Sequence, residues 1–232
     1  MSIEICITNC NNSENLKKCI QSIKDNTVDF KIIVCDQNSK DGTREWLQEN
    51  VGHIILDKKR RGRSDGKNQC LKVCYWDWIC MIDPDTQIMD KEWLDKIWNY
   101  TMNPKIGFIE VEINTIYDDK PIKVFGGLSC CLIRRTCLNE IGYFDSRLLH
   151  CGDYDFYSRL EWSGWWTEYC NGVNIVNTTG RGMNGCFDWN IEKLKIELLK
   201  NLGFKYTMNF MEQTVIKNIL RRNLMKRELL EK

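Results

Sequence analysis

The sequence predicts an α/β fold in which helices cover both faces of a mostly parallel central sheet. Two observations support this prediction. In the first half of the chain, short β-rich apolar runs alternate with helical patterns in the order β-α-β-α-β-α-β. Polar residues follow three of these runs, and ligands bind beyond the carboxyl ends of the strands in such sheets. The sequence therefore predicts a binding site along one edge of the sheet.

The composition indicates an ordinary globular protein. Its 232 residues include 43% hydrophobic and 28% charged residues, and the net charge of +1 provides no global field to recruit nucleic acid. The start of the chain does not resemble a signal peptide, and no run approaches the roughly 20 apolar residues of a membrane helix. We therefore expect a cytoplasmic protein. We expect its 13 cysteines to be reduced, because no Cys-x-x-Cys pair occurs and only two histidines are present.

The first half contains four expected strands and three expected helices. Ser13 is expected to cap the first helix, and Trp46 and Leu47 mark the second. The third helix is predicted over residues 65–74. The strands are predicted at residues 3–7, 30–35, 53–56 and 78–82.

The second half is less regular. Alternation over residues 106–113 predicts a strand near a sheet edge, and residues 124–133 predict another strand with a close backbone approach at Gly126 and Gly127. An acid-rich helix is predicted within residues 151–166. We expect residues 1–183 to form the α/β domain and residues 184–232 to form a helical appendage with a basic end. That appendage is expected to contact a membrane surface, to form a homodimer, or to face solvent, and these alternatives remain open.

The strand at 78–82 ends in Asp83-Pro84-Asp85, which places two carboxylates one residue apart. Pro84 cannot continue a central strand, so the chain must turn there and both carboxylates can face one point. Such oxygen ligands suit Mg²⁺ or Mn²⁺, which bind one or two carboxylates together with substrate phosphates. The alternative is a simple turn before the next helix. The position of the motif after a fourth strand favours the metal site.

Two further loops carry polar residues at the same predicted edge. Residues 36–43 predict either a pocket for a nucleobase and ribose or a plain βα turn. Residues 60–68 are basic and open a helix, which suits a diphosphate, and a solvated basic loop is the alternative.

Taken together, these segments resemble the family 2 glycosyltransferases of the GT-A fold. The resemblance extends over residues 3–176. It rests on seven segments in the family's order: 7–11, 36–43, 62–68, 83–85, 127 with 133–135, 141–145 and 153–160. It implies an inverting transfer of a sugar from a nucleoside diphosphate to a hydroxyl group. We expect a UDP-sugar as the donor, a glycan or lipid-linked acceptor, and Mn²⁺ or Mg²⁺ as the cofactor.

The resemblance also implies a role for each matching residue. Asp153 would be the general base, supported by Asp155 and Arg159, and Asp85 would be the main metal ligand, with Asp83 beside it. Trp162 is expected to stack on an acceptor sugar, with packing at the helix end as the alternative. The donor nucleotide is expected to contact Thr8, Asn9, Asn11, Asp36, Gln37, Lys67 and Asp83.

Three positions depart from the family pattern. Gln37 replaces an aspartate, Gly152 replaces a glutamate, and Asn177 stands where the family often has a metal-binding histidine. These departures motivate an alternative, a catalytically weak or inactive nucleotide-binding relative. A sugar-phosphate nucleotidyltransferase is disfavoured, because its glycine-rich loop is absent between Thr8 and Ser13.

Overall fold

The computed structural model describes residues 2–117, 120–125, 127–146 and 152–178. The chain divides into two units, Met1–Met183 and Asn184–Lys232, and all described residues belong to the first unit. The predicted C-terminal appendage lies outside the described residues.

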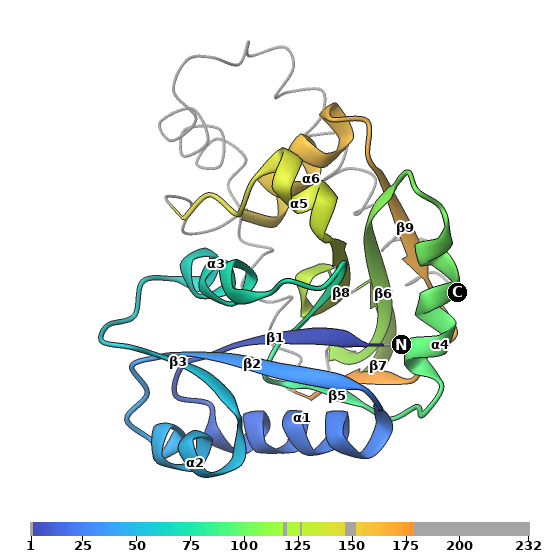
Figure 1. Ribbon diagram of the computed structural model, residues 1–232. Coiled ribbons are helices and arrows are strands. Elements are labelled where there is room, and N and C mark those ends of the chain that lie inside the picture. The colour runs from blue at the N-terminus through green and yellow to red at the C-terminus, as the bar shows by residue number, and fades with distance from the viewer. Residues whose placement is uncertain (1, 118–119, 126, 147–151, 179–232) are drawn as a thin grey trace. The chain divides into compact units, whose positions relative to one another are not determined.

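One sheet runs through the described residues in the order β3-β2-β1-β4-β8-β6-β10-β5, and β7 and β9 also pair with β6 (Figure 1). Strands β1 to β4 are parallel, which confirms the four predicted strands and their shared carboxyl edge. β8 is antiparallel to β4 and β6. The strands are β1 Ile3–Asn9, β2 Phe30–Gln37, β3 His53–Asp57, β4 Trp78–Ile82, β5 Thr86–Ile88, β6 Ile106–Tyr117, β7 Lys120–Phe125, β8 Cys130–Arg134, β9 Trp166–Cys170 and β10 Ile175–Asn177.

Helices cover both faces of the sheet, as predicted (Figure 1). Alternate residues of each strand enter two separate cores, because side chains point to opposite faces at successive positions. Ile5 packs with α1 and α4 in one core, while Cys6 packs with α3, α5 and α6 in the other. The helices are α1 Ser13–Asn26, α2 Thr43–Asn50, α3 Arg63–Val73, α4 Trp93–Trp98, α5 Arg135–Ile141 and α6 Gly152–Trp162, with short 3₁₀ turns η1 Asn99–Met102 and η2 Gly127–Ser129.

Of three local predictions, two were wrong. Ser13 does not cap α1: the N-cap is Asn12, and its side chain makes no capping hydrogen bond. The prediction that residues 106–113 form a strand near an edge is confirmed, since β6 pairs with β9 on the side away from β8, and β9 has no other partner among the described strands. The strand predicted over residues 124–133 is divided between β7 and β8, which are joined through η2.

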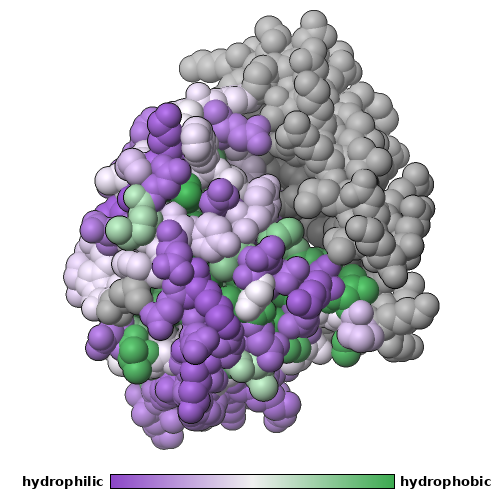
Figure 2. Space-filling model, turned by 90° about the vertical axis from the view of Figure 1, so that its right-hand side faces the viewer, coloured by the Kyte–Doolittle hydropathy of each residue, from purple (hydrophilic) through white to green (hydrophobic). Residues whose placement is uncertain are grey.

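Figure 2 shows one face of the molecule, on which hydrophilic side chains cover most of the coloured surface and hydrophobic areas are smaller. This pattern agrees with the placement of the large apolar side chains in the two cores. Among the described helices, none has the length and hydrophobicity needed to span a membrane.

Candidate active site

Asp36 organises the carboxyl edge where β1 and β2 end. Its carboxylate is fully buried and accepts hydrogen bonds from the backbone N–H of Ser39 at 3.0 Å, from the Ser39 hydroxyl, and from Nδ2 of Asn9 at 3.2 Å. Arg44 adds an ion pair at 3.3 Å. Because donors from Asn9, Ser39 and Arg44 surround its carboxylate, Asp36 holds its loop in place.

Asn9 and Asn11 extend this network in different ways. Asn9 is buried, and its Oδ1 has no hydrogen-bond partner among the described residues. A buried acceptor without a partner is costly, so this atom suits an external donor group. Asn11 has a positive φ of 50°, and its Oδ1 accepts the backbone N–H of Lys40 at 2.7 Å. Its side chain therefore holds the neighbouring loop.

Thr8 and Gln37 meet α3 at Gly66. A Cβ atom at Gly66 would lie 2.4 Å from Cγ2 of Thr8 and 2.5 Å from Nε2 of Gln37, so only glycine lets the helix come this close. Nε2 of Gln37 also donates to the carbonyl of Gly62 at 2.8 Å. The strand ends and the start of α3 are therefore brought together.

The Asp83-Pro84-Asp85 segment forms the tight turn that the proline predicted. The backbone N–H of Thr86 donates to the Asp83 carbonyl at 3.0 Å, and β5 begins at Thr86. The carbonyl of Asp85 accepts the backbone N–H of Thr178 at 2.8 Å and its hydroxyl at 3.0 Å. The end of β10 therefore fixes the turn from the other side.

Lys67 joins this turn to α3. Its Nζ lies 3.1 Å from Oδ1 of Asp83 and 3.4 Å from the carbonyl of Leu128. The Lys67 side chain is only 11% exposed, whereas that of Asp83 is 34% exposed. The structure thus places an almost buried ammonium group beside the first carboxylate of the motif.

Two contacts in this region had not been predicted. The Ser129 hydroxyl donates to Oδ2 of Asp83 at 2.9 Å, and the backbone N–H of Gly127 donates to Oε1 of the buried Glu110 at 2.6 Å. Neither Ser129 nor Glu110 carries a local sequence signal. Only the pair Gly126 and Gly127 had predicted a close approach of the backbone in this region.

The donor atoms fit a divalent metal that is completed by other ligands. Both oxygens of Asp83 accept hydrogen bonds, one from Nζ of Lys67 and the other from the Ser129 hydroxyl. Asn177 pairs in the β-ladder with Thr86, the residue after Asp85. The described residues contain no group of three or more His, Cys, Asp or Glu side chains able to hold a metal. Mg²⁺ and Mn²⁺ commonly complete such partial sites with phosphates and water.

The acidic helix is α6. Asp153 and Asp155 lie in its first turn, where carboxylates interact favourably with the helix dipole. Asp155 is buried, and its Oδ2 accepts Nη2 of Arg159 at 2.7 Å and Nε at 3.0 Å. Arg159 also donates to the carbonyls of Ile141, Gly142 and Tyr143. Asp155 and Arg159 thus tie α6 to the end of α5.

Gly152 brings the start of α6 against the start of α3. A Cβ atom at Gly152 would lie 2.7 Å from Oγ of Ser64. A larger residue would therefore require the Ser64 hydroxyl to turn away, while the Ser64 Cβ would stay at an ordinary distance of 3.9 Å. Asp153 follows directly, so α6 begins beside the helix that carries Lys67.

Trp162 is not close to Asp153. The two residues lie at opposite ends of α6, nine positions or about 14 Å apart along the helix axis. Trp162 is 40% exposed. Trp165 packs partly against the second core, and its indole nitrogen donates to Glu140 at 2.9 Å.

Asp41 links the first turns of α1 and α2 beside the same loops. Its carboxylate accepts the backbone N–H of Ser13 at 3.0 Å and the hydroxyl of Thr43 at 2.6 Å. Partial desolvation would raise the pKa of Asp41, but these hydrogen bonds outweigh it and hold the pKa below its usual value. The ionised carboxylate therefore stabilises both helix starts.

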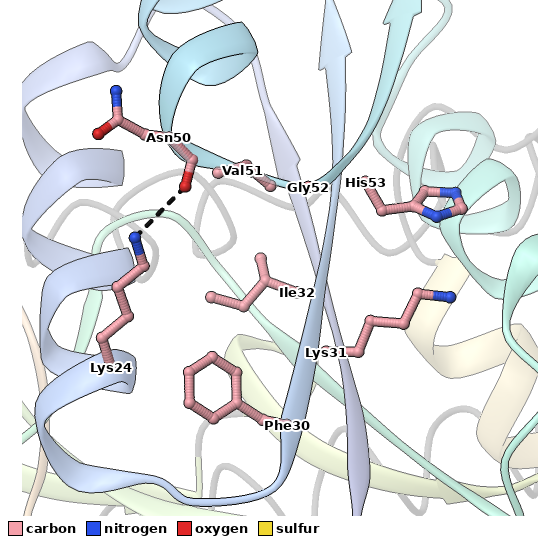
Figure 3. A pocket seen from close by; sticks show the side chains of 8 residues that line it. All are labelled: Lys24, Phe30, Lys31, Ile32, Asn50, Val51, Gly52 and His53. Atoms are coloured by element: carbon pink, nitrogen blue, oxygen red, sulfur yellow. Dashed lines mark hydrogen bonds between the residues drawn. The ribbon is translucent and has the colours of Figure 1, made fainter.

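A separate pocket of about 310 Å³ lies at the opposite edge of the sheet, where β2 and β3 begin (Figure 3). Phe30, Ile32 and Val51 supply apolar surface, and Nζ of Lys24 donates to the Asn50 carbonyl at 3.3 Å. None of the predicted site residues lines this pocket.

Comparisons with known proteins all indicate the same class of enzyme. The family model described as Glycosyl transferase family 2 matches residues 4–141. A mannosyltransferase from Pyrobaculum calidifontis, solved with GDP-Man and Mn²⁺, is 14% identical with a TM-score of 0.65, covering 91% of this chain and 67% of that one. TarS 1-349 from S. aureus, solved with UDP, is 13% identical with a TM-score of 0.65, covering 92% of this chain and 69% of that one. No curated protein matches the sequence significantly.

Proposed function

Because this chain belongs to glycosyl transferase family 2 and is a glycosyltransferase with the GT-A fold, we propose that it moves a sugar from a nucleoside diphosphate to a hydroxyl acceptor, with inversion at the anomeric carbon. UDP-sugars are the first choice of donor. A glycan or a lipid-linked hydroxyl compound is the proposed acceptor.

The ion pair between Lys67 and Asp83, beside the Asp83-Pro84-Asp85 turn, is the observation that most directly supports this proposal. An ammonium group held at the carboxyl edge of a parallel sheet is well placed to meet a diphosphate. The same edge offers the unpartnered Oδ1 of Asn9 and the amide of Gln37 for hydrogen bonds to a base or ribose. We assign the nucleotide to Thr8, Asn9 and Gln37, and the diphosphate to Lys67.

Asp85 is the proposed metal ligand, with Asn177 as a neighbouring oxygen donor. A bound Mn²⁺ or Mg²⁺ would supply positive charge for the departing diphosphate. Within the described part of the chain, no three His, Cys, Asp or Glu side chains gather to hold such an ion, so the donor's phosphates would provide further ligands. We therefore propose that metal and nucleotide bind together far more tightly than either binds alone.

Asp153 is the proposed general base. A hydroxyl group is a weak nucleophile, so a carboxylate within hydrogen-bond reach must take its proton as it attacks. Asp155 and Arg159 would act by holding the first turn of α6 in place. The alternative is a weak or inactive nucleotide-binding relative, motivated by Gln37, Gly152 and Asn177.

The test is release of nucleoside diphosphate from UDP-, GDP-, dTDP- and CDP-sugars by the full chain, with Mn²⁺, with Mg²⁺ and with EDTA. Thermal shifts measured with each nucleotide report binding without turnover. Metal-dependent release from one donor supports the transferase. Metal-dependent binding without release from any donor, even with a broad panel of glycan acceptors, would favour the inactive relative.

A further inference from the structure

We propose that η2, the turn Gly127–Ser129, positions the Lys67–Asp83 pair, and that Ser129 is a positioning residue for the transfer reaction. This inference rests on the proposed function. It goes beyond that function by assigning a role to a segment that none of the proposed donor, metal or base contacts includes.

Each of the three residues of η2 makes a contact in this region. The Gly127 N–H donates to Glu110 at 2.6 Å, and the Leu128 carbonyl accepts Nζ of Lys67 at 3.4 Å. The Ser129 hydroxyl donates to Oδ2 of Asp83 at 2.9 Å, and the Ser129 carbonyl accepts the Asp83 backbone N–H at 3.0 Å. One short turn therefore contacts both members of the ion pair.

The sheet register explains how Ser129 reaches Asp83. β4 and β8 are antiparallel, and Ile82 is paired with Cys130. The residue after Ile82 therefore lies opposite the residue before Cys130. At its other end, η2 is held by Glu110, which is buried on the central strand β6. Gly127 has a φ of 59°, which favours glycine at the point where its N–H meets this carboxylate.

The physical consequence concerns the direction of the Asp83 carboxylate. One oxygen faces Lys67 and the other faces Ser129, so rotation of the carboxylate would break both contacts. Without the hydroxyl, water can replace the lost hydrogen bond at this partly exposed group but cannot fix its orientation. Lys67 would then lose its defined position. A flexible ammonium stabilises developing charge less well than a preorganised one.

The matched variants are Ser129→Ala, which removes the donor, and Ser129→Thr, which keeps a hydroxyl. Ser163→Ala is the control, because Ser163 is exposed and lies in the turn after α6. We expect Ser129→Ala to lower kcat/KM for the donor about tenfold or more, as expected for a lost hydrogen bond to a charged group. Ser129→Thr should recover most of the loss, and Ser163→Ala should match the wild type. If Ser129→Ala folds poorly by circular dichroism, Ser129→Cys provides a variant of similar size with a weaker donor.

A double-mutant cycle separates positioning from general stability. In an Asp83→Ala background, removing the Ser129 hydroxyl should cause little further loss, because the group that it orients is gone. An equal loss in both backgrounds, or transfer by Ser129→Ala within twofold of the wild type, would overturn the inference while leaving the proposed function intact. A well-folded wild-type chain that transfers no sugar would overturn the proposed function and this inference with it.

Discussion

Lys67 and Asp83 form an ion pair of 3.1 Å that joins α3 to the end of β4, and each partner also contacts η2. The pair combines a nearly buried ammonium group with a carboxylate that is partly open to solvent. It lies where two predicted motifs meet, the basic helix start and the Asp83-Pro84-Asp85 turn.

Replacement of Lys67 should weaken both donor binding and turnover. Lys67→Met keeps a long apolar side chain but removes the charge, so we expect kcat/KM for the donor to fall about a hundredfold or more. Lys72→Met on the same helix is the control, because Lys72 is exposed and lies over the ring of Tyr143. Steady-state kinetics of both variants measure the change in kcat/KM for the donor. Equal activity of the two variants would remove Lys67 from the donor site.

Gly66→Ala should disturb the contact between α3 and the two strand ends. The new Cβ would lie within 2.5 Å of atoms in Thr8 and Gln37, and overpacking of this kind costs about 1–3 kcal/mol of unfolding free energy. Urea unfolding and nucleotide titration should both show the change. Gly52→Ala is the matched control, since a Cβ there meets nothing within 4 Å. Similar stabilities for the two variants would contradict the close approach at Gly66.

Asp41 predicts a pH-dependent contribution to stability. Its pKa is lowered in the folded state, so its contribution is fully present above the usual aspartate pKa of about 3.9 and is lost as the pH falls through the folded value. Asp41→Ala should therefore cost about 1 kcal/mol near neutral pH, as for a lost helix cap, and much less near pH 2. Asp95→Ala, at an exposed position in α4, is the control. A difference that stays constant with pH would contradict the assignment.

Asp153→Asn should separate donor binding from transfer. The amide keeps the size of the side chain but cannot accept a proton from a hydroxyl, so turnover should fall at least a hundredfold while nucleotide affinity stays within about twofold. Calorimetry and transfer assays on the same preparation provide both numbers. Transfer at the wild-type rate would remove Asp153 from the role of base.

The sequence predicted the parallel half of the sheet well because its signals are local. Each strand from β1 to β4 is a short apolar run, and Pro84 marks a turn in any context. The second half depends on pairings between distant segments. β6 lies next to the edge strand β9, as its alternation predicted, but no local pattern specifies that it pairs with four other strands.

In the candidate site too, only residues with a local sequence signal could be predicted. Asn9, Asp36, Lys67 and Asp83 could be named because they stand at strand ends or at the start of a helix. Ser129 could not, because its contact with Asp83 depends on the antiparallel register of β4 and β8. Trp162 lies at the opposite end of α6 from Asp153, and its stacking on an acceptor sugar stays a prediction.

The most direct test of the account is a calorimetric titration of the wild-type chain and of Asp85→Asn with UDP in the presence of Mn²⁺, with UDP alone and with Mn²⁺ alone. GDP, dTDP and CDP are titrated in the same way. We expect tight binding of one nucleotide only when metal is present, weak binding of the nucleotide or the metal alone, and loss of the metal effect in Asp85→Asn. Binding that is independent of metal, or unchanged in Asp85→Asn, would contradict it.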